Sequence, residues 1–145
     1  MNIPQLDLSN FLQGDDTIKK QFIEDLGSAF ENVGFVSIIN HGISQSLIDS
    51  VYKDVQLFFS LPVSSKKSYE IANLAGQRGY TSFGREHAKG SIAPDLKEFF
   101  QYGQPHSSSS DKSEYPDNVL VHDIDTFNTN LDAAFKSFEN AVLIY

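Results

Sequence analysis

Apolar side chains recur at helical spacing in three separate parts of the sequence, and this pattern limits the fold more than any other feature. A spacing of three to four residues places such side chains on one face of an α-helix, so each stripe predicts an amphipathic helix. Asp15 or Asp16, Ser44 and Asp125 precede the stripes and suit the N-cap position. The stripes consist of Phe22, Leu26 and Phe30 with Ile23 and Ala29 beside them; Leu47, Val51, Val55 and Phe58; and Phe127, Leu131, Ala134, Phe135, Phe138, Val142 and Tyr145.

The segments between these helices predict only short strands. Residues 3–8 alternate in polarity, residues 35–39 predict a largely buried strand, and residues 97–103 predict a third one. Gly34 ends the first helix, and Asn40-His41-Gly42 suits a tight turn with unusual dihedral angles. Long helices and short strands together predict an α+β fold, with three or four helices packed around the strands.

The middle of the chain shows a weaker periodic pattern of apolar residues. Pro62 predicts a short helix that runs through Lys66, Lys67 and Tyr69, with both lysines on its solvated face. Residues 73–92 are rich in glycine and polar side chains and predict a surface loop, and loops of this length are often functional. Residues 105–117 contain four consecutive serines and predict a flexible connection.

Composition excludes several classes of protein. The net charge of -8 argues against a nucleic-acid partner, because binding to phosphate needs a basic surface. The absence of cysteine excludes disulfides, thiolate zinc sites and thiol nucleophiles. No apolar stretch approaches the ~20 residues of a membrane span, and the first residues do not form a signal peptide. We expect a cytoplasmic protein without a membrane partner.

Four ordered motifs resemble the N-terminal region of the isopenicillin N synthase-like oxygenases. The motifs are Ile3-Pro4-Gln5-Leu6-Asp7; Gly34-Phe35-Val36-Ser37-Ile38-Ile39-Asn40-His41-Gly42-Ile43; Phe58-Phe59-Ser60-Leu61-Pro62 with Lys66; and Gly79-Tyr80 followed by Asp95-Leu96-Lys97-Glu98-Phe99-Phe100. Tyr115-Pro116-Asp117-Asn118 is similar to a fifth family motif. The family commonly continues with Trp-Pro, whereas this chain has Leu120-Val121. The ordered set is specific, although each motif describes scaffold more than chemistry.

The resemblance implies an iron(II)/2-oxoglutarate-dependent oxygenase that acts on a small-molecule substrate. In the family, two histidines and a carboxylate hold Fe(II), and 2-oxoglutarate takes open positions on the metal. The resemblance implies an N-terminal domain over residues 1–118. Residues 119–145 then form a connector and the start of a helix that supports a catalytic jelly roll. Since that helix reaches Tyr145 without a stop signal, we expect the chain to end before the jelly roll.

The ligands that the family uses are not found in this sequence. The family motif is His-x-Asp with a later His, joined by an Arg-x-Ser for 2-oxoglutarate. The residues two places after the four histidines are Ile43, Lys89, Ser108 and Ile124, and neither arginine begins Arg-x-Ser. We therefore predict no catalytic residue and no metal ligand in this chain, with Fe(II) and 2-oxoglutarate bound only by the complete protein.

Two other interpretations of the histidines stay open. His122, Asp123 and Asp125 could form a separate metal site, or they could be a solvated helix start with Asp125 as the cap. His41 could be a ligand, or a hydrogen-bonded histidine that shapes the turn between Asn40 and Gly42.

The candidate substrate-binding residues are Arg78, Tyr80 and Arg85. In the family, the segment around Gly-Tyr runs near the mouth of the active site, and an arginine there could bind a carboxylate with its planar fork of donors. The alternative is exposed arginines on a polar loop beside a partly buried tyrosine.

Two rivals to the oxygenase hypothesis remain. The chain could be a stand-alone binding module derived from this fold, or a structural domain whose resemblance reflects fold alone. The sequence names neither the substrate nor the oligomeric state.

Overall fold

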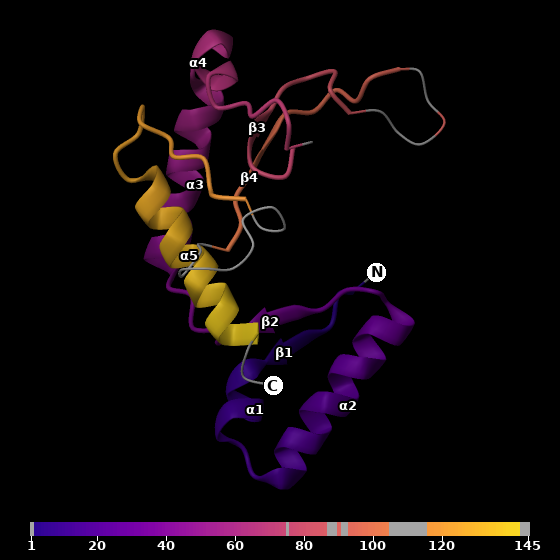
Figure 1. Ribbon diagram of the computed structural model, residues 1–145. Coiled ribbons are helices and arrows are strands. Elements are labelled where there is room, and N and C mark those ends of the chain that lie inside the picture. The colour runs from indigo at the N-terminus through magenta and orange to yellow at the C-terminus, as the bar shows by residue number, and fades with distance from the viewer. Residues whose placement is uncertain (1, 75, 87–89, 91–92, 105–115, 143–145) are drawn as a thin grey trace. The chain divides into compact units, whose positions relative to one another are not determined.

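The computed structural model describes residues 2–74, 76–86, 90, 93–104 and 116–142. The predicted connection at 105–117 lies largely outside these residues, as do His87 and His106. The chain forms two compact units, and each is described here by itself. The described residues of 1–44 and 137–145 belong to the first unit, and those of 45–136 belong to the second. The helices and strands are labelled in Figure 1.

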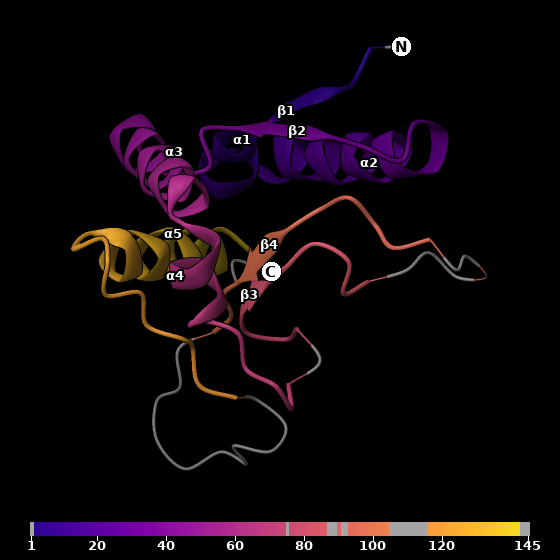
Figure 2. The same ribbon diagram turned by 90° about the horizontal axis from the view of Figure 1, so that it is seen from above.

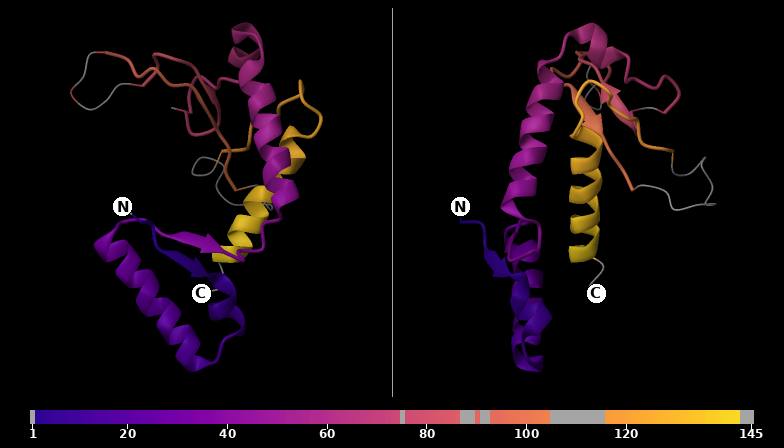
Figure 3. Two further views of the ribbon diagram at one scale, coloured as in Figure 1. Left: turned by 180° about the vertical axis from the view of Figure 1, so that it is seen from behind. Right: turned by 90° about the vertical axis from the view of Figure 1, so that its left-hand side faces the viewer.

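The first unit contains two short parallel strands and two helices. Its elements are β1 (Gln5–Asp7), α1 (Leu8–Gln13), α2 (Asp16–Asn32) and β2 (Ser37–Ile39), followed at the other end of the chain by the last residues of α5 (Phe127–Val142). Leu6 pairs with Ile38 at the centre of the parallel ladder. The two strands lie side by side, with α2 next to them (Figure 3).

Asp7 ends β1 and begins α1, so the predicted strand over residues 3–8 is too long. Its Oδ1 accepts hydrogen bonds from the backbone N–H of Ser9 at 2.9 Å and from the Ser9 hydroxyl at 2.6 Å. Its Oδ2 accepts a hydrogen bond from the Asn40 side chain at 2.8 Å. This cap starts a helix at Leu8, where only a strand is predicted from the sequence.

Helix α2 follows the prediction closely. Asp15 is its N-cap and accepts from the backbone N–H groups of Thr17 and Ile18. Gly34 has a φ of 81° and closes the helix with a hydrogen bond to the Ala29 carbonyl. The predicted turn at residues 40–42 is also present, because Asn40 and Gly42 both have positive φ.

The first unit buries less of its apolar surface than the sequence predicts. Phe22 and Ala29 are buried, but Phe30 on the same predicted stripe is 57% exposed. The expectation of a largely buried strand at 35–39 is wrong, since Phe35 is 66% exposed. These side chains lie next to a single parallel strand pair, which is too small to cover them.

The second unit is built around aromatic side chains. Its elements are α3 (Gln45–Ser60), α4 (Val63–Lys67), β3 (Gly79–Thr81), β4 (Phe99–Gln101) and the first part of α5. Strands β3 and β4 lie next to each other (Figure 2). They are antiparallel, and Tyr80 pairs with Phe100. The buried core consists of Phe58, Tyr69, Tyr80, Val121, Ile124 and Phe127.

A buried carboxylate ties α3 to the start of α5. Asp54 accepts hydrogen bonds from the Thr126 hydroxyl at 2.8 Å and from the Asn130 side chain at 2.7 Å. The two helices lie side by side there (Figures 1 and 3). Since α5 begins at Phe127, the residue before it is Thr126, and the prediction that Asp125 caps this helix is wrong by one position.

Candidate functional site

Strand β3 holds Tyr80 in a fixed place. All three residues of β3 are buried, and the Tyr80 backbone N–H donates to the Tyr69 carbonyl at 3.0 Å. Gly79 has a φ of 75°, and a Cβ there would stand 2.4 Å from the Tyr69 carbonyl oxygen. Only glycine therefore allows the chain to enter β3 along this path.

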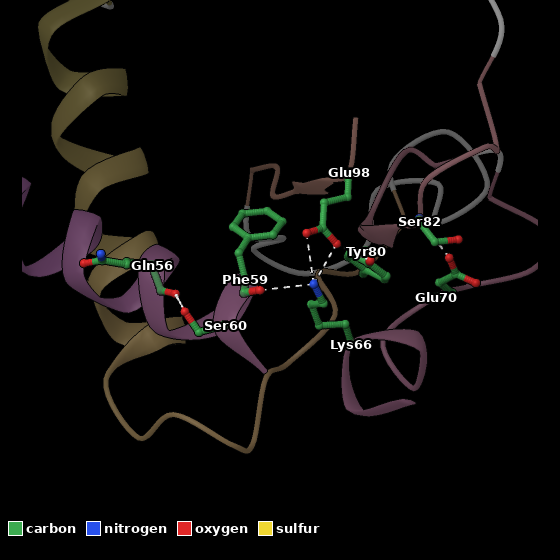
Figure 4. A network of polar contacts seen from close by, with 8 residues as sticks. All are labelled: Gln56, Phe59, Ser60, Lys66, Glu70, Tyr80, Ser82 and Glu98. Atoms are coloured by element: carbon green, nitrogen blue, oxygen red, sulfur yellow. Dashed lines mark hydrogen bonds and ion pairs between the residues drawn. The ribbon is translucent and has the colours of Figure 1, made fainter. Parts of the chain in front are cut away.

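A buried ion pair lies beside Tyr80. The Lys66 Nζ contacts both carboxylate oxygens of Glu98, at 2.9 and 2.8 Å, and donates to the Phe59 carbonyl at 3.1 Å (Figure 4). The same ammonium lies 5.7 Å from the centre of the Tyr80 ring, and the Tyr80 hydroxyl donates to Glu98. Lys66 is only 5% exposed, so the prediction of a solvated face is wrong for Lys66, whereas Lys67 is exposed as predicted.

The protonation states of this network follow from its contacts. Burial and the hydrogen bond to Glu98 raise the pKa of the Tyr80 hydroxyl, so Tyr80 stays protonated near neutral pH. Burial alone would raise the pKa of Glu98, but the hydrogen bonds from Lys66 and Tyr80 outweigh it and hold that pKa below its ordinary value. The network is thus a neutral donor and an ion pair, and its polar groups satisfy one another.

A pocket of about 270 Å³ opens in the same unit, and we call it the Glu70–Arg85 pocket. Its polar lining includes the side chains of Glu70, Thr81, Arg85 and Glu86. The Ser82 backbone N–H donates to Glu70 Oε1 at 2.9 Å, as Figure 4 shows beside Tyr80. Hydrogen bonding with Ser82, helped by the charges of Arg85 and Lys67, holds the pKa of Glu70 below its ordinary value. The pocket is lined by Glu70, Ile71, Gly76, Tyr80, Thr81, Arg85 and Glu86.

The structure brings two of the three predicted substrate-binding residues together. Tyr80 and Arg85 both line the Glu70–Arg85 pocket. Arg78 lies elsewhere: its Nη1 donates to the Gln77 carbonyl at 2.8 Å, and a Cβ on Gly103 would stand 2.3 Å from its Cζ. The buried Nε of Arg78 has no hydrogen-bond partner among the described residues. A role in substrate binding stays a prediction for all three.

Glu70 and Thr81 also line the pocket but are not among the predicted site residues. Neither belongs to a motif, and their proximity depends on the close approach of residues 69 and 70 to β3, which includes a bridge between Glu70 and Gly79. No local signal in the sequence would have found this long-range contact.

The histidines in the described part of the chain make hydrogen bonds within the fold. The His41 Nδ1 accepts from the Ile43 backbone N–H at 3.1 Å, which fits the turn interpretation. The His122 backbone N–H donates to the Tyr69 hydroxyl at 3.1 Å, and that hydroxyl donates to Asp123. Within the described ranges, no three His, Asp or Glu side chains converge on a point where they could hold a metal ion. The described residues therefore do not offer the converging donors that an Fe(II) site needs.

Comparison with known proteins identifies the fold. The family profile described as "non-haem dioxygenase in morphine synthesis N-terminal" matches residues 3–123. The chain belongs to this family. The resemblance drawn from the motifs is thereby confirmed.

This dioxygenase N-terminal domain is similar to curated 2-oxoglutarate-dependent enzymes. It is 36% identical over 87 residues to the 2-oxoglutarate-dependent dioxygenase frbA of Dothideomycetidae sp. (strain 11243), which covers 59% of this chain and 26% of that protein. It is 38% identical over 68 residues to thebaine 6-O-demethylase of Papaver somniferum, which covers 47% of this chain and 19% of that one. The domain thus spans about a quarter or less of these relatives.

Solved structures agree over almost the whole domain. A 2OG-Fe(II) oxygenase family protein from Caulobacter crescentus matches with a TM-score of 0.77 and 32% identity, covering 97% of this chain and 46% of that one. A Neurospora crassa protein solved with alpha-KG and thymine matches with a TM-score of 0.76 and 25% identity, covering 95% and 44%. The mixture of helices and short strands predicted from the sequence is therefore confirmed. No helix in the described ranges of this dioxygenase N-terminal domain is long and apolar enough to cross a membrane.

Proposed function

We propose that the complete protein is an iron(II)/2-oxoglutarate-dependent oxygenase acting on a small molecule, and that residues 1–145 are its N-terminal scaffold. One observation carries this proposal: 97% of the chain matches a 2OG-Fe(II) oxygenase family protein with a TM-score of 0.77. A match of this extent includes both compact units, so the whole chain takes part in the likeness.

We infer that Fe(II) and 2-oxoglutarate are held by residues outside this chain. The described residues offer no converging ligands, and the sequence contains neither His-x-Asp nor Arg-x-Ser. The division at residue 118, the catalytic jelly roll and the support of that jelly roll by α5 belong to the same proposal. The cytoplasmic location stays a prediction from the sequence.

The proposal gives Arg78, Tyr80 and Arg85 a place at the mouth of the active site. Support comes from Tyr80 and Arg85, which line one pocket. The Tyr80 ring is also held in place, since it belongs to β3 and lies 5.7 Å from the Lys66 Nζ. Since the Tyr80 hydroxyl is engaged with Glu98, its ring rather than its hydroxyl would contact the substrate. The buried Nε of Arg78 is a donor without a described partner, which supports its inclusion.

A stand-alone binding module is the alternative. The aromatic core of the second unit favours it, because Phe58 and Phe127 are already fully buried within this chain. A stand-alone module should be monodisperse and should unfold in one cooperative transition. A dependent domain should associate or bind apolar dyes. Size-exclusion chromatography with a melting curve separates these outcomes.

The oxygenase proposal is tested by the coding sequence after Tyr145 and by turnover. We expect the reading frame to contain His-x-Asp and a later His. The protein encoded by that frame, given Fe(II) and 2-oxoglutarate, should release succinate. Residues 1–145 alone serve as the control and should release none. A frame that continues without those ligands would refute the proposal.

A further inference from the structure

Two opposite charges face the Glu70–Arg85 pocket without forming a direct ion pair. Arg85 lies close enough to lower the pKa of Glu70, yet no ion pair joins the two among the described contacts. The Ser82 N–H donates to Oε1 of Glu70 at 2.9 Å, so hydrogen bonding with Ser82, and not an ion pair, engages this carboxylate. The lining of the pocket therefore includes both a carboxylate and a guanidinium.

The second acid of the pocket is already neutralised. Glu86 contacts the Lys97 ammonium at 2.8 Å, and Lys97 also contacts Asp95 at 3.4 Å. Lys67 contributes positive charge near Glu70 but does not line the pocket. The charges that remain for a ligand are thus one negative group and one positive group.

An unsatisfied hydroxyl points to a ligand in the same place. Thr81 is 6% exposed and lines the pocket, and its buried Oγ1 has no hydrogen-bond partner among the described residues. Buried polar atoms of this kind are uncommon because each costs stability. Gly76 lies beside it, and a Cβ at Gly76 would stand only 3.0 Å from this oxygen. With glycine at position 76, no side chain of that residue presses on the hydroxyl.

We propose that the Glu70–Arg85 pocket binds a small zwitterion, with its ammonium at Glu70, its carboxylate at Arg85 and a hydrogen bond to the Thr81 hydroxyl. A volume of about 270 Å³ lies just below the usual range for ligand sites and fits a molecule the size of an amino acid. Identifying this ligand as the substrate rests on the proposed oxygenase function, whereas its binding is a property of this chain alone.

The test is a titration of residues 1–145 followed by amide chemical shifts and calorimetry. The probes are 4-aminobutanoate and 6-aminohexanoate, and the matched controls are butanoate and butylammonium, each of which lacks one charge. We expect saturable binding of at least one zwitterion, with shifts at residues 70–85, and binding of each control at least about tenfold weaker, which is ~1.4 kcal/mol.

Three variants locate the site. Glu70→Gln and Arg85→Gln each remove one charge and should weaken binding about tenfold. Thr81→Val keeps the shape and removes the unpartnered hydroxyl. It should weaken zwitterion binding, and it should raise the unfolding midpoint because an unpartnered buried hydroxyl costs stability. A threonine with a purely structural role would not give both changes. Glu31→Gln, an exposed substitution in α2, is the control and should leave affinity unchanged.

The proposal would be overturned if neither zwitterion showed saturable binding, or if butanoate bound as tightly as the zwitterions. It would also be overturned if the Arg85→Gln and Thr81→Val proteins folded and bound the zwitterions with unchanged affinity. Because Arg85 is exposed, its variant keeps the test valid if Glu70→Gln fails to fold. These readouts are independent of the succinate assay. A zwitterion site without turnover would therefore refute only the oxygenase proposal, and turnover without such a site would refute only this one.

Discussion

The two units of this domain differ in how far their apolar side chains are buried. In the second unit Phe58 has no exposed surface, and its ring lies within 6.0 Å of the rings of Phe59, Tyr69, Tyr80, Phe100 and Phe127. In the first unit Phe138 is 59% exposed and lines a mainly apolar hollow of about 390 Å³ with Phe30 and Leu26.

The difference shows where the stability of this domain resides. Burial of a large apolar side chain contributes roughly 1.5–3 kcal/mol, and the second unit obtains this contribution from its own residues. The first unit presents much of its apolar surface to solvent, and surfaces of this kind are commonly sites of association. The substitutions below test this contrast, from the largest expected effect to the smallest.

Phe58→Ala should have the largest effect. Removing a fully buried ring should lower the free energy of unfolding by about 3–5 kcal/mol, because a cavity forms among several aromatic partners. Phe138→Ala, the matched change in the first unit, should cost less than about 1 kcal/mol, since little contact is lost. Urea denaturation followed by circular dichroism measures both, and equal losses would remove the contrast between the units.

Breaking the buried ion pair should come next. Lys66→Met leaves Glu98 buried without its cation and should cost about 3 kcal/mol. The exposed neighbour provides the control, since Lys67→Met should change stability by less than about 0.5 kcal/mol. Adding Glu98→Gln to Lys66→Met should recover part of the loss. A Lys66→Met protein as stable as the Lys67→Met protein would show that the pair contributes nothing.

The same pair predicts an acid limb in the stability profile. The pKa of Glu98 in the folded protein lies below its ordinary value of 4.5, so on acidification the unfolded chain takes up this proton first. The contribution of Glu98 is therefore complete above pH 4.5 and is lost as the pH falls through the folded pKa. Denaturation midpoints from pH 7 to pH 3 should fall less steeply in Glu98→Gln than in the parent. Parallel curves would contradict this assignment.

Asp54→Asn should have an intermediate effect. The side-chain oxygen of an asparagine can still accept from one of the two donors, Thr126 or Asn130. Its side-chain NH2 group would face the other donor and cannot accept a hydrogen bond. The expected loss is about 1–3 kcal/mol. Asp49→Asn on the exposed side of the same helix is the control. Thermal unfolding compares the two, and indistinguishable midpoints would mean that the link between α3 and α5 is unimportant.

Phe30→Ser should have the smallest effect on stability and the largest effect on dye binding. Phe30→Ser removes apolar surface from the hollow at a cost below about 1 kcal/mol, because the side chain is already half-exposed. Binding of an anilinonaphthalene dye should fall, whereas Tyr52→Ser on the exposed face of α3 should leave it unchanged. Undiminished fluorescence in Phe30→Ser would place the dye elsewhere.

The parts of this fold that the sequence predicts are those governed by local interactions. Helical spacing located α2, α3 and α5, and Asp15 and Gly34 marked the ends of α2 because caps act within one turn. Helix α1 was missed, although Asp7 followed by Ser9 is a capping signal in retrospect. The strand interpretation took precedence there because residues 3–8 alternate so regularly.

The site depended on contacts that local patterns do not encode. Lys66 was predicted to be solvated because its partner, Glu98, lies 32 residues further along the chain. The family resemblance points to Tyr80 and Arg85, and both line the pocket. Glu70 and Thr81 carry no motif, so only the folded chain shows that they face the same space.

Asp7 has a consequence for how this sequence can vary. One carboxylate oxygen starts α1 through Ser9, and the other holds Asn40, whose φ is 54°. The first and second family motifs thus meet in a single side chain. Replacement of Asp7 by a residue without a carboxylate would leave the Asn40 side chain without its acceptor. The two positions should therefore change together among relatives. An alignment would record this dependence as correlated inheritance between sites 33 residues apart.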